Sequence, residues 1–213
     1  ALGGNAGFLS LVGDDEIGAY YLQEMHKNKL NCKGIKIRVG EETGRCLSMI
    51  SPDSERTMRT RQGVAAKMCA NDFHAEDFQD YTHLFVEGYA LYTPDVAGKI
   101  MNTAYQQGLK IAYDAGSPEL VANNRDTLKV LLNDYVTVAF FNELEACAFA
   151  DSDDPLIALQ KLSELCPLAV VKLGSKGVYI AEENAEKISY VAAKNVNPLD
   201  STGAGDFWAA AFL

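Results

Sequence analysis

The sequence predicts an α/β fold, in which helices cover the faces of a mostly parallel β-sheet. The main basis for this prediction is a regular alternation of short apolar runs with longer stretches of helical periodicity, which begins near Tyr81. Alternation of this kind is typical of βαβ units. The composition agrees with it, because 213 residues that are 48% hydrophobic and 23% charged can fill one sizeable core.

The individual elements can be read in chain order. The runs that have the length and apolar content of buried strands are HLFVEGYA, LKIAYDAG, YVTVAFFN, LAVVKLG and GVYIAEE. The stretches with helical spacing are TPDVAGKIMNTAYQQG, SPELVANNRDTLKVLLND, ELEACAFA and DDPLIALQKLSELC. Ser117 followed by Pro118 is a typical helix start, which predicts a helix over residues 117–134. The last two strands are expected to meet across the turn from Gly174 to Gly177.

Residues 31–62 have a different pattern, which predicts a small β appendage, or lid. The segments RCLSMI and RTMRTR flank the turn sequence Pro52-Asp53-Ser54 like the arms of a hairpin. Residues 1–30 and 63–213 are then expected to form the α/β core of a single domain. In an enzyme such a flap often closes over a site. An edge hairpin without a function is the alternative.

Composition disfavours several classes of protein. The net charge of −10 makes nucleic acid a poor partner, because an acidic surface repels phosphate backbones. No run approaches the length of about 18 apolar residues that a membrane-spanning helix needs. The five cysteines and three histidines have no zinc-site spacing, and the absence of paired cysteine motifs favours a reducing cytoplasm.

The segment Gly203-Ala204-Gly205-Asp206 carries the clearest chemistry. Small residues at the start of a helix leave its free N–H groups open to an anion, and the helix dipole favours the same ligand. A carboxylate beside that site repels a phosphate that is merely held, but it can accept a proton from an alcohol that attacks a phosphoryl group. A plain turn with Asp206 as a partner of the helix dipole is an equally weighted alternative on these residues alone.

This last segment also carries a family resemblance. DSTGAGDFWAAAFL resembles the carboxy-terminal signature of the PfkB, or ribokinase-like, carbohydrate kinase family. The segments LGGNAGFLSLVGDDEIGAYYLQEM, TGRCLSMISPDSERTM, FVEGYA, NELEA and VVKLGSKGVYI are similar to further parts of that family. The resemblance implies a Rossmann-like three-layer sandwich with a mostly parallel central sheet and a small β lid. It also implies transfer of the γ-phosphate of ATP, with Mg²⁺, to a hydroxyl of a small sugar.

The resemblance assigns roles to residues. Asp206 is implied as the catalytic base, with Gly203, Ala204 and Gly205 as the anion hole. Asn142 and Glu145 are implied to act near the phosphates and, for Glu145, indirectly on Mg²⁺; without the resemblance, a helix cap and a solvated acid are favoured. The implied nucleotide contacts are Lys172, Gly174, Ser175 and Gly177, although some members carry a small hydroxyl residue in place of Lys172. The implied substrate contacts are Glu87, Asp114 and Arg61, and the positions that bind a monovalent cation such as K⁺ in some relatives are Asp200 and Thr202.

The acceptor and the extent of the chain are the points on which alternatives stay open. Ribose, fructose or a ketodeoxy acid is one class of acceptor, and a nucleoside such as adenosine is the other. A non-catalytic ligand-binding relative is a further alternative. The sequence has neither G-x-G-x-x-G after its first strand nor G-x-x-x-x-G-K-[ST], which disfavours a hydride-transfer enzyme and a P-loop kinase. The family comparison implies a chain truncated at both ends, and the lid is the expected surface of a homodimer.

Overall fold

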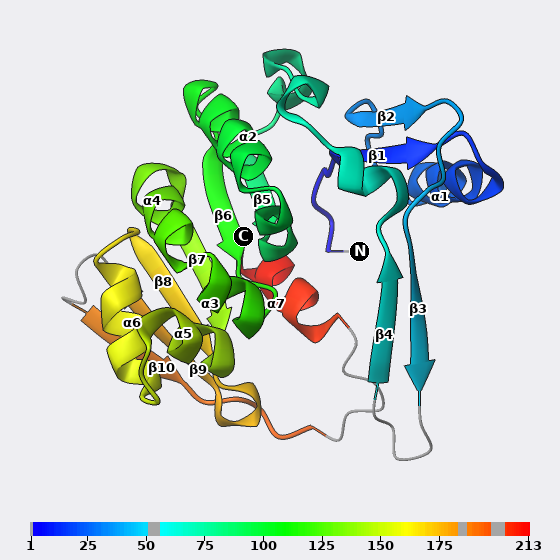
Figure 1. Cartoon of the computed structure of the whole chain (residues 1–213). Coiled ribbons are helices and arrows are strands. Elements are labelled where there is room, and N and C mark those ends of the chain that lie inside the picture. The colour runs from blue at the N-terminus through cyan, green and yellow to red at the C-terminus, as the bar shows by residue number, and fades with distance from the viewer. Residues whose placement is uncertain (1, 51–55, 183–186, 197–202) are drawn as a thin grey trace. The chain divides into compact units, whose positions relative to one another are not determined.

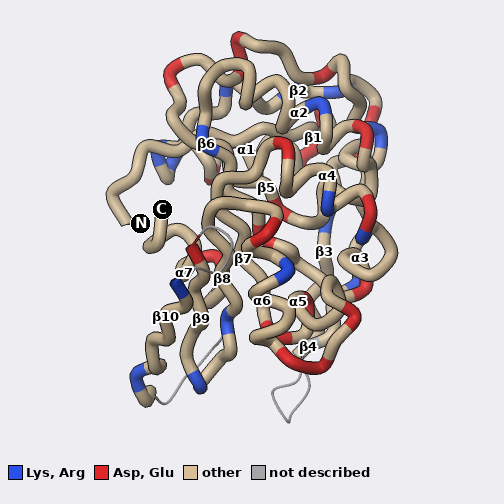
Figure 2. Tube along the Cα trace, turned by 90° about the vertical axis from the view of Figure 1, so that its left-hand side faces the viewer, with Lys and Arg blue, Asp and Glu red and all other residues tan. Residues whose placement is uncertain are grey.

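The computed structural model describes residues 2–50, 56–182, 187–196 and 203–213. Contacts between residues divide the chain into two compact units, which comprise residues 3–77 and residues 78–213 (Figure 1). Acidic positions are spread along the trace of both units (Figure 2), in keeping with the net charge of −10. None of the described helices is long and apolar enough to cross a membrane.

The larger unit is built on a six-stranded sheet with the order β10-β9-β8-β7-β6-β5. Its strands are β5 (His83–Glu87), β6 (Lys110–Asp114), β7 (Val138–Asn142), β8 (Leu168–Lys172), β9 (Val178–Glu182) and β10 (Lys187–Val191). The pairs from β5 to β8 are parallel, whereas β8–β9 and β9–β10 are antiparallel. The predicted α/β fold with a mostly parallel sheet is therefore confirmed.

Helices cover both faces of this sheet and make three layers. They are α2 (Pro94–Gln106), α3 (Pro118–Asn123), α4 (Arg125–Tyr135), α5 (Glu143–Ala150), α6 (Pro155–Ser163) and α7 (Ala204–Phe212). Successive strand residues point to opposite faces, so Phe141 packs against Phe149 of α5 while its neighbour Phe140 packs against Trp208 and Phe212 of α7. α7 thus lies on the face opposite to α5 (Figure 1).

The helix predicted over residues 117–134 is wrong in one respect, because it consists of two helices. α3 ends at Asn123, and Asn124 adopts φ −120° and ψ 21° before α4 begins. The Asn124 side chain donates a hydrogen bond to the carbonyl oxygen of Leu120 at 3.0 Å. Asparagine disfavours helix interiors because its amide competes in this way for backbone groups, and this competition accounts for the break.

The smaller unit contains two short sheets. The first pairs β1 (Ser10–Gly13) in parallel with β2 (Ile35–Arg38), and the second pairs β3 (Arg45–Ile50) antiparallel with β4 (Arg56–Arg61). α1 (Glu16–Lys27) follows β1. The two arms of the predicted hairpin are therefore confirmed as β3 and β4, while β2 pairs with β1 and lies outside that hairpin. The domain boundaries at residues 31 and 62 stay a prediction.

Short 3₁₀ segments complete both units. They are η1 (Gly63–Lys67), η2 (Ala70–Asp72), η3 (Ala75–Phe78), η4 (Gly88–Tyr92) and η5 (Gly174–Lys176). η4 follows β5 directly and begins with Gly88, where a Cβ would lie 1.8 Å from the Ala115 carbonyl oxygen. Only glycine permits this approach, which brings the ends of β5 and β6 close together.

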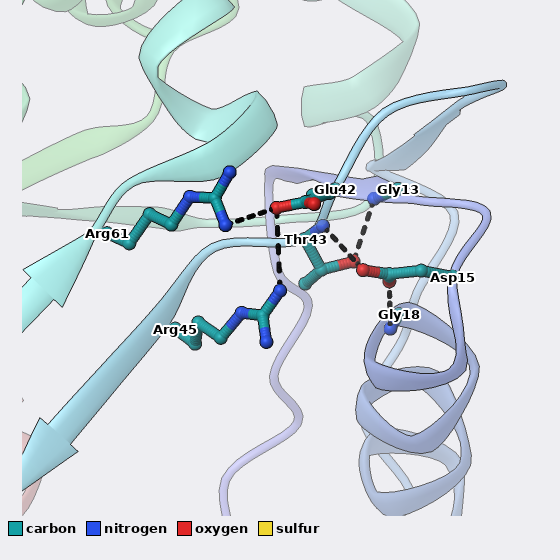
Figure 3. Close-up of polar contacts among 7 residues, drawn as sticks. All are labelled: Gly13, Asp15, Gly18, Glu42, Thr43, Arg45 and Arg61. Carbon is teal, nitrogen blue, oxygen red and sulfur yellow. Dashed lines mark hydrogen bonds and ion pairs between the residues drawn. The ribbon is translucent and has the colours of Figure 1, made fainter.

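Asp15 ties the start of α1 to the segment that leads into β3 (Figure 3). Its carboxylate accepts hydrogen bonds from the Thr43 hydroxyl at 2.5 Å, the Gly18 N–H at 2.8 Å and the Thr43 N–H at 3.0 Å. The Thr43 oxygen in turn accepts the Gly13 N–H at 2.9 Å. These donors, the Thr43 hydroxyl first, hold the pKa of Asp15 below its ordinary value of 3.8.

This network predicts a measurable pH dependence of stability. Because the folded-state pKa of Asp15 is depressed, its contribution is present above pH 3.8 and is lost as the pH falls through the folded-state value. In the Asp15→Asn variant, the free energy of unfolding should therefore fall less steeply with acid than in the wild type. Urea unfolding at a series of pH values below and above 3.8 measures the free energy of unfolding of each protein. Glu16→Gln, in the first turn of the same helix, is the control. Equal acid slopes for Asp15→Asn and the wild type would contradict the prediction.

Candidate active site

Four of the residues singled out in the sequence lie at one edge of the large sheet. Parallel strands place their carboxyl ends at the same edge, where α/β folds bind ligands. Glu87 ends β5 opposite Asp114 of β6, and Asn142 ends β7 opposite Lys172 of β8. The four residues therefore form a staggered row, because Asp114 pairs with Phe140 of β7 and Asn142 lies two residues beyond that pair.

Two members of this row form an ion pair that the sequence did not reveal. The Lys172 Nζ atom lies 2.7 Å from Oδ2 of Asp114, and the two side chains are 17% and 14% exposed. Since β7 lies between β6 and β8, the lysine must extend across β7 to reach this partner. The family resemblance implies a nucleotide contact for Lys172 and a substrate contact for Asp114, so their pairing is a finding of the structure.

The first turn of α7 lies beside the lysine of this pair. Gly203 is the N-cap in the left-handed region, with φ 75°, and the Phe207 N–H closes the first helical turn on the Gly203 carbonyl oxygen at 2.9 Å. The N–H groups before Phe207 have no acceptor within the helix. A Cβ on Gly205 would lie 3.6 Å from the Lys172 Nζ atom. Within the described residues, N–H groups without a helical acceptor and an ammonium group are therefore close together at the start of α7.

Asp206 completes the turn. Asp206 is exposed. Its Oδ2 atom would lie 3.7 Å from a Cβ on Gly203, so the carboxylate folds back over the glycine turn. Ala204 is exposed and Gly205 is half-buried, so packed side chains do not cover the turn. This arrangement can accept an anion at the amides and a proton at the carboxylate.

Asn142 and Glu145 form a reciprocal capping box at the start of α5. The Glu145 N–H donates to Oδ1 of Asn142 at 2.9 Å, and the Asn142 N–H donates to Oε2 of Glu145 at 2.7 Å. The cap interpretation therefore holds for Asn142, but Glu145 is 3% exposed and is not a solvated acid. Burial raises the pKa of Glu145, the Asn142 N–H lowers it, and the charge of Asp114 raises it further.

Negative charge accumulates at this edge. Desolvation raises the pKa of the Glu87 carboxyl, although much of the residue is exposed, and the charges of Asp206 and Asp114 raise it further. Lys172 acts in the opposite direction on both Glu87 and Glu145. An incoming phosphate therefore needs more cationic charge than Lys172 alone supplies.

The residues present fit a Mg²⁺ ion that is carried by phosphates. In the part of the chain that the structure describes, no group of three or more histidine, cysteine or acidic side chains is arranged to hold a metal ion. Mg²⁺ rarely needs such a group, because it keeps several waters and binds one or two carboxylates together with substrate phosphates. The oxygen donors at this edge, including the Glu145 carboxylate, suit that indirect mode.

The turn between β8 and β9 continues the site from Lys172. Gly174 and Gly177 adopt φ 60° and 126°, and a Cβ on Gly177 would lie 2.2 Å from the Val191 carbonyl oxygen. Ser175 is exposed between them. The turn therefore presents backbone and a hydroxyl at the carboxyl end of β8.

The remaining predicted residues lie elsewhere. Asp200 and Thr202 are outside the described residues. Arg61 belongs to the smaller unit, where it forms an ion pair with Glu42 at 2.6 Å, and Glu42 also pairs with Arg45 at 3.4 Å (Figure 3). Its side chain is 67% exposed, and its approach to a substrate stays a prediction.

Comparisons with known proteins identify relatives of the chain. The sequence model of the family described as pfkB family carbohydrate kinase matches residues 1–213. The chain is 24% identical to the ATP-dependent ribose-1-phosphate kinase of Halopiger xanaduensis, over 98% of the chain and 66% of that protein. It is 25% identical to the 2-dehydro-3-deoxygluconokinase of Bacillus subtilis, over 98% of the chain and 67% of that protein.

A solved structure gives the same result at the level of the fold. The adenosine kinase from Sinorhizobium meliloti superposes with a TM-score of 0.88 at 26% identity, over 99% of this chain and 65% of that one. The fold is therefore ribokinase-like. The chain spans about two thirds of the length of the relatives that it matches.

Proposed function

Because the chain belongs to the pfkB family of carbohydrate kinases, we propose that the protein transfers the γ-phosphoryl group of ATP to a hydroxyl of a small sugar. One observation carries this proposal: the open first turn of α7, with Asp206 on it, lies beside the ammonium of Lys172, which is paired with Asp114. An acceptor hydroxyl and a phosphoryl group need a base and a cradle of positive charge at one point, and this turn offers both.

The proposed reaction is a direct displacement at phosphorus. The acceptor oxygen forms a bond to the γ-phosphorus, the bond from that phosphorus to the ADP oxygen breaks, and the hydroxyl proton passes to the Asp206 carboxylate. The N–H groups of Ala204 and Gly205 stabilise the charge on the equatorial phosphoryl oxygens, with Gly203 shaping their approach. The phosphoryl group moves between two oxygens, so no oxidant or further reactant is required.

The other residues have supporting roles in this proposal. Gly174, Ser175 and Gly177 line the nucleotide, and Asn142 fixes the backbone at the end of β7. Mg²⁺, when bound, would neutralise phosphate charge, and the Glu145 carboxylate would help to hold it indirectly. Glu87 accepts a hydrogen bond from an acceptor hydroxyl. Asp200 and Thr202 are the proposed ligands of a monovalent cation such as K⁺.

A nucleoside is the second candidate acceptor. The similarity to an adenosine kinase structure at 26% identity favours it, whereas the similarity to the 2-dehydro-3-deoxygluconokinase at 25% identity favours a sugar. Both candidates present a primary or secondary hydroxyl to the same base. The chemistry proposed for Asp206 is therefore the same for either acceptor.

An acceptor screen tests the proposed function. ADP release by the full-length protein is measured with ATP, Mg²⁺ and, in turn, ribose, fructose, 2-keto-3-deoxygluconate and adenosine. We expect one acceptor to raise ADP release well above the rate with ATP alone, and the phosphorylated product to be detected by mass spectrometry. If ATP binds but no acceptor in this panel is phosphorylated, the result favours the non-catalytic ligand-binding relative.

A further inference from the structure

We propose that Lys172 is a phosphoryl-binding residue of this site and that Asp114 is a positioning residue that holds its ammonium group beneath α7, not a contact for the acceptor. The inference rests on the proposed kinase function and deepens it. It also changes the role of Asp114, which the family resemblance placed on the substrate side.

The path of the Lys172 side chain is the first argument. Strands of a sheet lie about 4.8 Å apart, so β6 and β8, which flank β7, are separated by roughly 10 Å. The 2.7 Å contact between Lys172 and Asp114 therefore requires the lysine to extend across β7, where Phe140 is the register partner of Asp114. Asp114 draws the ammonium to the middle of the row instead of leaving it at the end of β8.

The face on which the pair lies is the second argument. Ala112 and Asp114 are two residues apart on β6, and Val170 and Lys172 are two residues apart on β8. Ala112 and Val170 belong to the buried cluster that contains Ala209 of α7. Residues two apart on a strand share a face, so Asp114 and Lys172 lie on the face that α7 covers.

The contact with Gly205 makes the third argument. With a Cβ position on Gly205 only 3.6 Å from the ammonium, Lys172 lies close to the first turn of α7. An ammonium group has three donors, and among the described residues Lys172 has one hydrogen-bond acceptor, Asp114, which leaves capacity for a further acceptor. A phosphoryl oxygen bound at the N–H groups of this turn could accept that further hydrogen bond from Lys172.

Asp114 has a clear physical purpose in this arrangement. Lys172 is 17% exposed, and a lysine of low exposure loses solvation in its charged form. The neighbouring carboxylate offsets this loss and restricts a flexible side chain to one direction. Removing Asp114 should therefore leave the charge of Lys172 less well placed, without removing a contact to the acceptor.

Nucleotide binding gives a test that does not depend on turnover. The probes are ADP and the non-hydrolysable ATP analogue adenylyl imidodiphosphate, each with Mg²⁺, titrated calorimetrically into the full-length protein. We expect Lys172→Met to weaken the analogue about 10- to 100-fold, as for loss of a charged hydrogen bond, with little change for ADP. Lys172→Arg should recover part of the loss, and Lys129→Met, which removes an exposed lysine of α4, should change neither affinity.

Steady-state kinetics separate the two roles of Asp114. If Asp114 positions Lys172, then Asp114→Asn lowers kcat with the acceptor KM near its wild-type value, and the double variant with Lys172→Met is no slower than Lys172→Met alone. If Asp114 instead binds the acceptor, Asp114→Asn raises the acceptor KM and its effect multiplies with that of Lys172→Met. That second pattern would overturn the positioning role.

The outcomes also distinguish this inference from the proposed function. Thermal unfolding first checks that the wild type and Lys172→Met are both folded. If the two proteins then have the same ratio of analogue affinity to ADP affinity, the Lys172–Asp114 pair is only structural. That result would overturn the inference and leave the proposed kinase activity standing. Loss of acceptor phosphorylation in the wild type itself would overturn the proposed function, and the affinity ratio would still decide the role of Lys172. Failure of the wild type to bind either nucleotide would overturn both.

Discussion

Asp206→Asn should lower kcat about 10²- to 10⁴-fold, the range that positioned general bases contribute. The substitution keeps the shape of the side chain and removes only its ability to accept the hydroxyl proton. ATP affinity should stay equal or improve, because the variant loses a negative charge beside the phosphates. Single-turnover measurements of product formation at saturating ATP and acceptor isolate this effect from binding.

The matched control for this variant is Asp126→Asn. Asp126 also lies in the first turn of a helix, α4, and its side chain is 98% exposed. It is not among the residues that the structure brings to the carboxyl edge of the sheet, so we expect wild-type kcat. Near wild-type turnover of Asp206→Asn would remove the base from the mechanism and leave the glycine turn as an anion site only.

The strands β5 to β9 could be predicted because each one is a short apolar run bounded by turn residues, whereas β10, which is mostly exposed, was missed. β7, for example, has buried residues from Val138 to Phe141, which is the pattern of a strand covered on both faces. The order of the strands could not be predicted this way, because it depends on contacts between segments far apart in the sequence. The break at Asn124 was missed because apolar periodicity continues on both sides of it.

The residues of the candidate site likewise differ in whether the sequence could identify them. The glycine turn and Asp206 form a contiguous motif, so the sequence could identify them together. The Lys172–Asp114 pair could not be found, since it requires β6 and β8 to flank β7. By contrast, the spacing of Asn142 and Glu145 matches a capping box, and that signal could have predicted their reciprocal hydrogen bonds.

Gly205→Val should lower kcat by about 10²- to 10³-fold, comparable to loss of one oxyanion-hole donor. A Cβ at this position meets the Lys172 Nζ atom at 3.6 Å, which is ordinary contact, but the two methyl groups of valine extend beyond it. They would occupy the space between the ammonium and the free amides, where the phosphoryl oxygens are proposed to lie. Steady-state kcat with saturating ATP and acceptor measures the loss.

Gly205→Ala is the control that separates this obstruction from a change in the helix. Alanine adds only the Cβ, for which the structure has room, and it favours the helix more than glycine does. We expect turnover close to wild type and a small gain in thermal stability. If valine and alanine at position 205 reduced kcat equally, the loss would arise from helix geometry, and if neither reduced it, the phosphoryl group would not bind at this turn.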